Sequence, residues 1–225
     1  MRFEIDHILI CTELSGPEAE QLCEFGLLEG SSNTHPGQGT ANRRFFFHNV
    51  MLELLWVHSR AEAQSDRTQR MGLWERWQGR QQEACPFGIA LRPTEALLAT
   101  DDIQFPFEGW VYQPLYLPAE MSIFVANNSL QAAEPLFFAA PFFKKITELD
   151  QAEPINHPPG FNEITAVTVA SPSLGTASAS LTALKKVDGL RFVEGPEHHL
   201  TLSVDGEKSG RSKNFSPALP LTIKW

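Results

Sequence analysis

The chain has 225 residues, 42% of them hydrophobic, which is enough to form a sizeable core and excludes an intrinsically disordered chain. Its formal net charge of −9 excludes the basic surface that a nucleic-acid-binding protein needs. No apolar run approaches the roughly 18 residues of a membrane helix, and the first residues lack the pattern of a signal peptide. The 3 cysteines match no zinc or disulfide spacing, so we expect free thiols in a cytoplasmic protein without nucleic-acid or membrane partners.

The N-terminal part of the chain predicts a unit with the order strand, helix, strand, strand, strand. Its strands are short apolar runs rich in β-branched, aromatic and leucine side chains. Gly26 is placed to end the helix, because glycine adopts the left-handed conformation that often follows a helix. The predicted elements are a strand over Phe3–Ile10, a helix over Ser15–Phe25, a short strand over Leu27–Glu29, a polar loop over Gly30–Gly39, and strands over Arg43–His48 and Val50–Val57.

Two polar residues stand inside the outer strands of this unit. His7 lies in the first apolar run and Glu53 in the last. A carboxylate in a buried strand costs several kcal/mol unless something pairs with it. An imidazole and a carboxylate are also natural ligands of a divalent metal. On the residues alone, a shared site and a solvent-facing Glu53 beside a core histidine are equally favoured.

The rest of the chain predicts two further units of similar order. A charged stretch over residues 58–82 includes a short amphipathic helix, and the proline-rich segment Pro154–Gly160 marks a boundary. Repetition at this scale implies that each unit has an apolar sheet face that another unit covers. The second unit has strands over 87–91, 109–113, 121–126 and 136–140 with a helix over 94–99, and the third has strands over 164–170, 190–193, 199–204 and 219–225 with a helix over 175–187.

The loop that precedes the third strand has the composition of a ligand-binding loop. Gly37 and Gly39 permit close backbone approach and positive φ angles. Thr40 and Asn42 offer a hydroxyl and an amide that orient a polar ligand, although such side chains also serve simply to satisfy loop backbone groups. Strand alternation then places the adjacent residues 43 and 44 on opposite faces, so that one arginine of the two reaches an anionic ligand or an acidic neighbour.

These residues resemble a known family. The runs Ile5–Ile10, His35–Asn42 and Leu52–Leu55, in this order and spacing, are similar to the glyoxalase-like domain family of the vicinal oxygen chelate (glyoxalase/bleomycin resistance/dioxygenase) superfamily. The resemblance implies an α+β fold in which repeated βαβββ modules form curved, half-open mixed β-sheets with helices on the outside. The implied modules span residues 1–60, with the expected pocket, 84–142, with a shortened helix, and 160–225.

The same resemblance implies a site in the first module. Metal-dependent members place His or Glu ligands on the first and last strands of each module, which here gives His7 and Glu53 as metal ligands and as catalytic residues. His35, Thr40, Asn42 and Arg44 are the expected ligand-binding residues. The second module has no ligand at the matching positions, where Gly88, Ile89 and Ala139 stand, and the third has Ala166 and Thr201. A divalent Zn, Mn, Fe, Ni or Mg ion and the absence of any metal are therefore equally expected.

Three functions follow from the resemblance. The first is a small-molecule enzyme in which a metal acts as Lewis acid in a lyase, isomerase or dioxygenase reaction. The second is a metal-free protein that binds and sequesters a small ligand. The third is a structural member whose unpaired module forms a homodimer. Because one fold of this kind hosts many activities, the sequence leaves enzymatic activity open.

Overall fold

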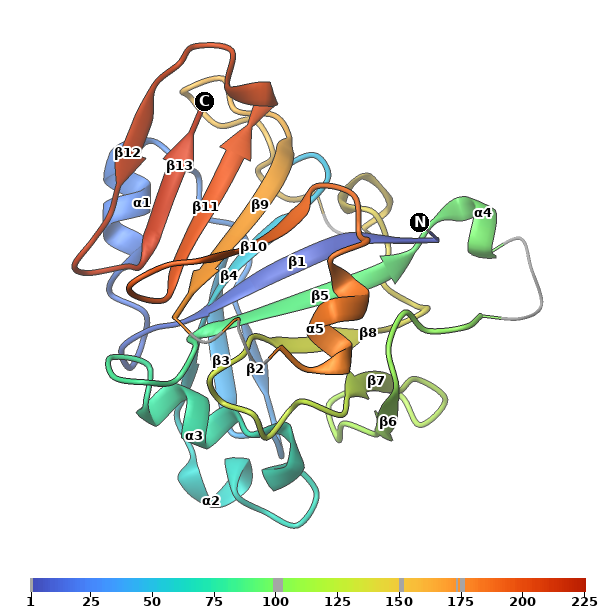
Figure 1. The fold of residues 1–225 in the computed structure, drawn as a ribbon. Coiled ribbons are helices and arrows are strands. Elements are labelled where there is room, and N and C mark those ends of the chain that lie inside the picture. Colours follow the sequence, from blue (N-terminus) through green and yellow to red (C-terminus); the bar gives the residue numbers. More distant parts are fainter. Residues whose placement is uncertain (1, 99–102, 150–151, 173, 175–176) are drawn as a thin grey trace.

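The computed structural model describes residues 2–98, 103–149, 152–172, 174 and 177–225. Two mixed β-sheets form the molecule, and short helices lie around them (Figure 1). The α+β class with curved, half-open mixed sheets, which the resemblance implied, is confirmed. No helix among the described residues has the length and apolar character needed to cross a membrane.

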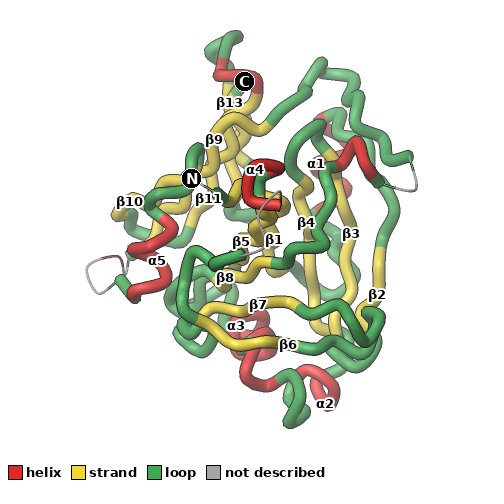
Figure 2. The backbone as a smooth tube through the Cα atoms, turned by 90° about the vertical axis from the view of Figure 1, so that its right-hand side faces the viewer, coloured by secondary structure: helices red, strands yellow, loops and turns green. Residues whose placement is uncertain are grey.

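The larger sheet, called sheet A, has eight strands in the order β2-β3-β4-β1-β5-β8-β7-β6. Its two central strands, β1 and β5, are antiparallel, and each has a parallel neighbour, β4 or β8, that comes later in the chain. Figure 2 shows the sheet curling from β6 round to β2. The strand bounds are β1 Phe3–Cys11, β2 Asn33–His35, β3 Thr40–Phe46, β4 Met51–Val57, β5 Phe87–Pro93, β6 Gly109–Tyr112, β7 Ile123–Ala126 and β8 Leu136–Ala139.

The smaller sheet, called sheet B, repeats the central pattern of sheet A with fewer strands. Its order is β10-β9-β11-β13-β12, in which β9 and β11 are antiparallel and have β10 and β13 as parallel neighbours. In the third segment of the chain, the first strand, β9, thus pairs with β10 and β11, whereas the last strand, β13, pairs with β11 and β12. The bounds are β9 Ile164–Ser171, β10 Leu190–Glu194, β11 His199–Val204, β12 Ser212–Asn214 and β13 Leu221–Lys224.

The helices are short and lie outside the sheets. Helix α1 begins at Ala19 rather than at the predicted Ser15, because Ser15 and Gly16 have φ angles of 70° and 58° that no α-helix accepts. It ends at Gly26 as predicted, with φ 106°. Ser178 caps α5 by accepting a hydrogen bond from the Leu181 amide. The helices are α1 Ala19–Phe25, α2 Arg60–Ala63, α3 Leu73–Gln78, α4 Glu95–Leu98 and α5 Ala179–Leu184; the predicted helix residues 99, 175 and 176 lie outside the described residues.

The predicted loop over Gly30–Gly39 contains a strand, and the predicted strand over Leu27–Glu29 is only a single bridge. Strand β2, over Asn33–His35, lies at the edge of sheet A, where its first two side chains are exposed. A short polar edge strand has no apolar alternation by which sequence would show it. The bridge joins Glu29 to Phe45 of β3.

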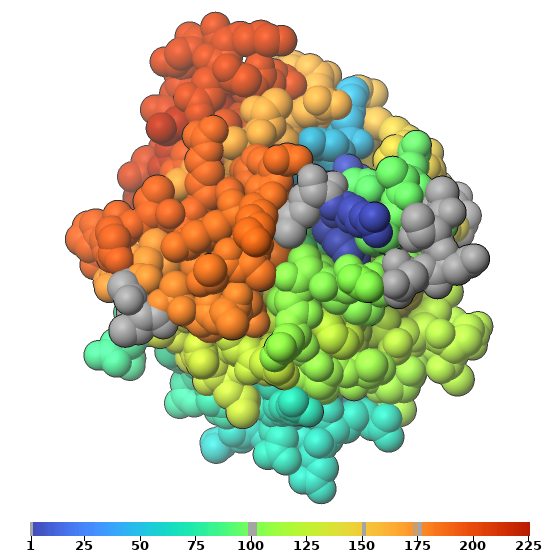
Figure 3. Space-filling model, turned by 45° about the vertical axis from the view of Figure 1, so that its right-hand side comes forward, coloured from blue at the N-terminus to red at the C-terminus, as the bar shows by residue number. Residues whose placement is uncertain are grey.

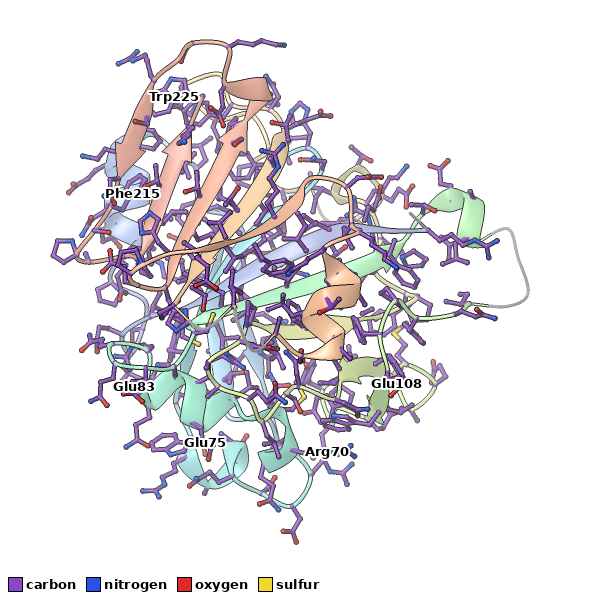
Figure 4. All side chains as sticks on the ribbon, viewed as in Figure 1. Arg70, Glu75, Glu83, Glu108, Phe215 and Trp225 are labelled. Atoms are coloured by element: carbon purple, nitrogen blue, oxygen red, sulfur yellow. The ribbon has the colours of Figure 1, made fainter. Side chains whose placement is uncertain are left out.

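The two faces of sheet A have different surroundings. Along β1 and β4 the side chains alternate, so that residues 8, 10, 52 and 54 join the core that includes sheet B, whereas residues 7, 9, 53 and 55 face the opposite side. The space-filling view in Figure 3 shows the C-terminal part of the chain, in orange and red, stacked on the green part. Helix α1 adds to the core, since Phe25 packs edge-on against Phe215 and Trp225, which Figure 4 labels. Sheet A is therefore backed by sheet B and hollow on its other face.

Candidate functional site

A cavity of about 450 Å³ lies on the face of sheet A that points away from sheet B. The polar wall comes mainly from β1 to β4, which also contribute Leu9, Phe46, Met51 and Leu55. The other wall comes from β7, β8 and the loops beside them and is mostly apolar, with Lys144 at its loop end. The polar wall consists of Asp6, His7, Asn33, His35, Gln38, Asn42, Arg44 and Glu53. The apolar wall includes Leu117, Met121, Ile123, Leu136, Phe138, Phe142 and Phe143. This division suits a molecule with a polar end and an apolar body.

The structure brings His7 and Glu53 into this cavity together. Strands β1 and β4 are parallel neighbours, with Leu9 beside Glu53, and both polar side chains point to the same face. Nε2 of His7 lies 3.8 Å from Oε2 of Glu53. This separation exceeds a hydrogen bond and leaves both atoms available to a third polar atom between them.

Asp6 is a residue of the site that sequence reasoning missed. Strict alternation sends Asp6 to the face opposite His7, but the β1–β5 register shifts between Ile5 and His7, which makes Asp6 the extra residue of a β-bulge. Both side chains therefore reach the same region, and Asp6 Oδ1 lies 2.6 Å from His7 Nδ1. Arg92 of β5 donates to the other carboxylate oxygen, Oδ2, at 3.2 Å. The signal in the sequence was an acidic residue directly before a histidine in an otherwise apolar strand.

The protonation of His7 follows from these contacts. Burial alone would lower the pKa of His7, but the hydrogen bond that Nδ1 donates to Asp6 and the negative charges of Asp6 and Glu53 outweigh it, so the pKa is raised above 6.5. Asp6 holds Nδ1, so Nε2 is the ring nitrogen that faces Glu53. In the protonated ring, Nδ1 donates to Asp6 and Nε2 is a second donor that faces the cavity.

Glu53 is held from its other side by Asn42 of β3. The Asn42 amide Nδ2 donates to Glu53 Oε1 at 2.5 Å, and its Oδ1 accepts a hydrogen bond from the Asn33 backbone at 2.7 Å. Asn42 and Asn33 both belong to strands of sheet A, so the sheet holds the Oε1 side of the Glu53 carboxylate. Oε2 is consequently the oxygen that a bound molecule would meet.

The other predicted ligand-binding residues lie close by. His35 and Arg44 line the cavity, whereas Thr40 contributes no surface to it. The Thr40 hydroxyl lies 2.8 Å from His35 Nδ1 and accepts a hydrogen bond from Gln38, so it holds two lining side chains from behind. Burial lowers the pKa of His35. Arg43 points to the opposite face and pairs with Glu29, as strand alternation predicted.

The segment between β6 and β7, residues 113–122 and called the strap, closes one side of the cavity. The Tyr116 hydroxyl donates to Gln38 Oε1 at 3.2 Å, and its ring lies 4.8 Å from that of His35. Leu115 lies against Gly37, where a Cβ would come within 2.7 Å of its side chain. Gly37 and Gly39 have the positive φ angles, 77° and 76°, that the sequence predicted. The strap therefore packs against the predicted ligand-binding loop.

Two aromatic rings, from β8 and from the loop after it, contact the His7 ring directly. The rings of Phe138 and Phe143 lie 5.4 and 5.3 Å from the His7 ring, both in edge-to-face geometry. Phe138 faces the cavity, while its neighbour Ala139 belongs to the core shared with sheet B. The His7 ring thus lies between polar side chains and an aromatic surface.

The site does not provide a complete set of protein ligands for a metal. Within the described ranges, no group of three or more His, Cys, Asp and Glu side chains has the arrangement to hold an ion. His7 Nε2 and Glu53 Oε2 make two donors, and a catalytic zinc ion usually has three protein ligands. Among the described residues, His35 also lines the cavity but forms no such group with these two, and His48 and His157 do not line it. The donor set therefore does not fit a tightly held metal.

Comparisons with known proteins find similar structures but no similar sequence among family models or curated proteins. Neither a family model nor a curated protein sequence matches the chain. A hypothetical protein from Staphylococcus aureus is similar in structure, with a TM-score of 0.56, 13% identity and 99% of each chain covered. A xylose isomerase-like TIM barrel/4-hydroxyphenylpyruvate dioxygenase fusion protein gives a TM-score of 0.47 at 12% identity, over 90% of this chain and 37% of that one. The first match shows that the fold extends along the whole chain in another protein.

Proposed function

We propose that the protein binds a small organic molecule in the cavity of sheet A, as a member of the vicinal oxygen chelate superfamily. The observation that carries this proposal is the division of the cavity into a polar and an apolar wall. An aromatic or aliphatic body would lie against Phe138 and Phe143, and a polar head would lie between His7 and Glu53.

The polar end defines the head group that would bind. His7 Nε2 donates a hydrogen bond and Glu53 Oε2 accepts one, across 3.8 Å. A hydroxyl or enol group satisfies both residues at once, because its oxygen accepts from His7 while its hydrogen is donated to Glu53. A plain carboxylate accepts from His7 but is repelled by Glu53 at this position, although Arg44 and Lys144 also line the cavity and attract an anionic group.

The same pair favours acid–base chemistry as a second candidate function. Glu53 Oε2 would accept a proton from a carbon next to a carbonyl group, and His7 Nε2 would donate a hydrogen bond to the carbonyl oxygen as negative charge develops there. Return of the proton to another atom of the same molecule completes an isomerisation. Asp6 is then a positioning residue, since it holds His7 without facing Glu53.

Binding of a panel of small hydroxy and keto compounds, with aromatic or aliphatic bodies, tests the proposal. Compounds that raise the melting temperature are measured again with Glu53→Gln, Phe138→Ala and, as a control on the opposite face of β3, Arg43→Gln. We expect Glu53→Gln to weaken compounds with a hydroxyl head and Phe138→Ala to weaken all of them, with Arg43→Gln unchanged. Equal binding to all four proteins would refute the proposal.

Metal analysis of the protein purified without chelator separates the metal-dependent alternative. A stoichiometric metal that His7→Ala and Glu53→Gln both lose would replace the acid–base proposal with Lewis-acid catalysis. Ligand binding that is unaffected by a chelator supports the metal-free site. A protein that binds no compound and forms a stable homodimer would instead favour the assembly role.

A further inference from the structure

Arg44 is a charged side chain of the cavity lining to which the proposed function gives no role. It lies on β3, which Figure 2 shows between β2 and β4. Its cross-strand neighbour on β4 is Glu53, and both side chains line the cavity. Side chains directly opposite each other on antiparallel strands have Cβ atoms about 5 Å apart. Arg44 therefore adjoins the polar end of the cavity, next to the His7–Glu53 pair.

Ser31 holds the guanidinium group of Arg44 from one side. Nε donates to the Ser31 carbonyl oxygen at 2.6 Å, and Nη2 donates to the Ser31 hydroxyl at 2.5 Å. The Ser31 hydroxyl in turn donates to Glu153, whose other carboxylate oxygen accepts from the Ser31 amide at 3.0 Å. Cζ of Arg44 also lies 5.2 Å from the ring centroid of Phe46, which lines the cavity too. These contacts fix the position of the charge before any ligand binds.

The third nitrogen of the group, Nη1, is open to a further partner. It forms no hydrogen bond with the described residues, whose contacts with Arg44 use only Nε and Nη2. Arg44 is half-buried, and Nη1 is not one of the buried atoms without a partner, so it is accessible to solvent. Nη1 carries two N–H groups. A molecule in the cavity can therefore accept hydrogen bonds from a positively charged nitrogen.

The charge of Arg44 is unpaired, in contrast to that of its neighbour in the chain. On the opposite face of β3, Arg43 lies 2.5 Å from Glu29 and 2.8 Å from Glu20. In the described part of the chain, no carboxylate forms an ion pair with Arg44. The acidic Glu153 reaches only Ser31. A carboxylate on a ligand would supply the missing partner.

The acidic side chains of the cavity are already engaged with cations. Asp6 accepts from Arg92 at 3.2 Å and from His7 at 2.6 Å. Glu53 lies 3.8 Å from His7. Neither carboxylate is therefore available to Arg44 without loss of these contacts. The lining thus has an excess positive charge on the side of β3.

The positive charge of Arg44 also acts on other side chains of the cavity. Burial is the main cause of the lowered pKa of His35, and the charge of Arg44 lowers it further. His35 lines the same polar wall. The guanidinium is therefore within electrostatic reach of the space in which a ligand would lie.

We propose that Arg44 binds the carboxylate of an organic acid in this cavity, so that the ligand is a hydroxy acid or an enol acid rather than a neutral alcohol. This inference rests on the proposed function, in which the hydroxyl lies between His7 and Glu53 and the apolar body lies against Phe138. The carboxylate then lies beside the hydroxyl, on the side of β3.

Two pairs of compounds that differ in charge test this inference. Mandelate and mandelamide share a phenyl ring and a hydroxyl group, and so do 3-hydroxybenzoate and 3-hydroxybenzamide, in which the two polar groups are farther apart. Isothermal titration calorimetry at neutral pH and low salt gives the ratio of the Kd of the amide to that of the acid. We expect this ratio to be about ten or more for at least one pair, because a hydrogen bond to a charged group contributes about that factor.

Three variants of the whole chain locate the preference. Arg44→Gln should bring the ratio close to one. Arg191→Gln removes the same charge from an exposed position of β10 and should leave the ratio unchanged. Phe138→Ala should weaken the acid and the amide alike. The comparison of acid with amide uses the unaltered protein, so it remains decisive if Arg44→Gln does not fold.

The possible results separate this inference from the proposed function. Amides that bind the unaltered protein as tightly as the acids, and that Phe138→Ala weakens, would overturn the role of Arg44 and leave the proposed function intact. A preference for acids that persists in Arg44→Gln would also overturn it, because another cation such as Lys144 would then bind the carboxylate. If none of the four compounds binds at millimolar concentration, the proposed function fails together with this inference.

Discussion

Asp6 and His7 are consecutive residues of one strand, yet the Asp6 carboxylate lies 2.6 Å from Nδ1 of the His7 ring. Only the bulge in β1 permits this contact, because consecutive side chains of a regular strand point to opposite faces. The contact raises the pKa of His7 and directs the other ring nitrogen, Nε2, toward Glu53. The pKa of His7 and its effect on stability, which can both be measured without a ligand, depend on this contact.

The free energy of unfolding should depend on pH because the folded protein holds the proton of His7 more tightly than the unfolded chain does. Its folded pKa is raised above the ordinary value of 6.5, because the Asp6 and Glu53 interactions exceed the opposing effect of burial. The stabilisation from the charged ring is complete below pH 6.5 and is lost as the pH rises through the raised value. Urea unfolding between about pH 6 and pH 9 should show stability falling with pH. The fall should be smaller in His7→Gln; an equal fall in both proteins would contradict the assignment.

Asp6→Asn should lower the pKa of His7. The substitution removes the negative charge and keeps the size of the side chain, so burial becomes the dominant influence on the ring. NMR titration of the histidine signals gives the pKa in both proteins. The His199 signals serve as an internal reference, since burial and Glu197, and neither Asp6 nor His7, shift the pKa of His199. An unchanged pKa of His7 in Asp6→Asn would show that the bulge contact does not control it.

Asn42→Ala should destabilise the protein by about 1–3 kcal/mol, because Glu53 Oε1 and the Asn33 amide each lose a buried partner. Chemical denaturation measures the change. Asn214→Ala in the exposed strand β12 is the matched control and should cost less, although it removes a local hydrogen bond to the Ser216 amide. Equal losses would mean that the Asn42 contacts contribute no more than a surface hydrogen bond.

Gly39→Ala should destabilise the loop under the strap more than Gly210→Ala destabilises its turn. Both glycines have positive φ, 76° and 65°, so both variants bear the cost of that conformation. A Cβ at Gly39 would come within 2.3 Å of the Ser59 carbonyl oxygen, while one at Gly210 meets nothing within 4 Å. The difference between the two unfolding free energies isolates the steric effect. A difference near zero would show that the Ser59 segment moves away freely.

The three thiols should differ in reactivity. Burial raises the pKa of Cys11 to about 12 and that of Cys85 to about 11, so both stay protonated and inaccessible at neutral pH. Cys23 is only partly buried. Alkylation of the native protein at pH 8, followed by mass spectrometry, should label Cys23 first. Labelling of Cys11 at the same rate would show that the end of β1 opens readily.

The sequence was most informative where side-chain alternation holds. It placed His7 and Glu53 inside strands and Arg43 and Arg44 on opposite faces, and the structure agrees with these placements. Asp6 was missed because a bulge depends on pairing with β5, which lies about 80 residues later in the chain. The division into modules 1–60, 84–142 and 160–225 stays a prediction.

The apolar wall and the strand pairing in sheet B could not be predicted from the sequence, for a different reason. Segments such as Phe142–Phe143 lie in loops, where no periodicity shows which face a side chain takes. In the third segment the strands themselves were largely predicted, but the order in which they pair depends on packing between distant elements. Strand β12 was missed because its three side chains are all exposed.

The two walls of the cavity differ in how freely they can change. Most of the polar wall belongs to the hydrogen-bonded strands of sheet A, which pack against sheet B. A substitution there therefore disturbs both the hydrogen bonds between the strands and the core between the two sheets. Much of the apolar wall comes from the segments around Tyr116 and Phe142, which lie outside the strands. Mutations in these segments break no ladder hydrogen bond. Substitutions in these segments can therefore reshape the apolar part of the cavity while the polar side chains on the strands keep their positions.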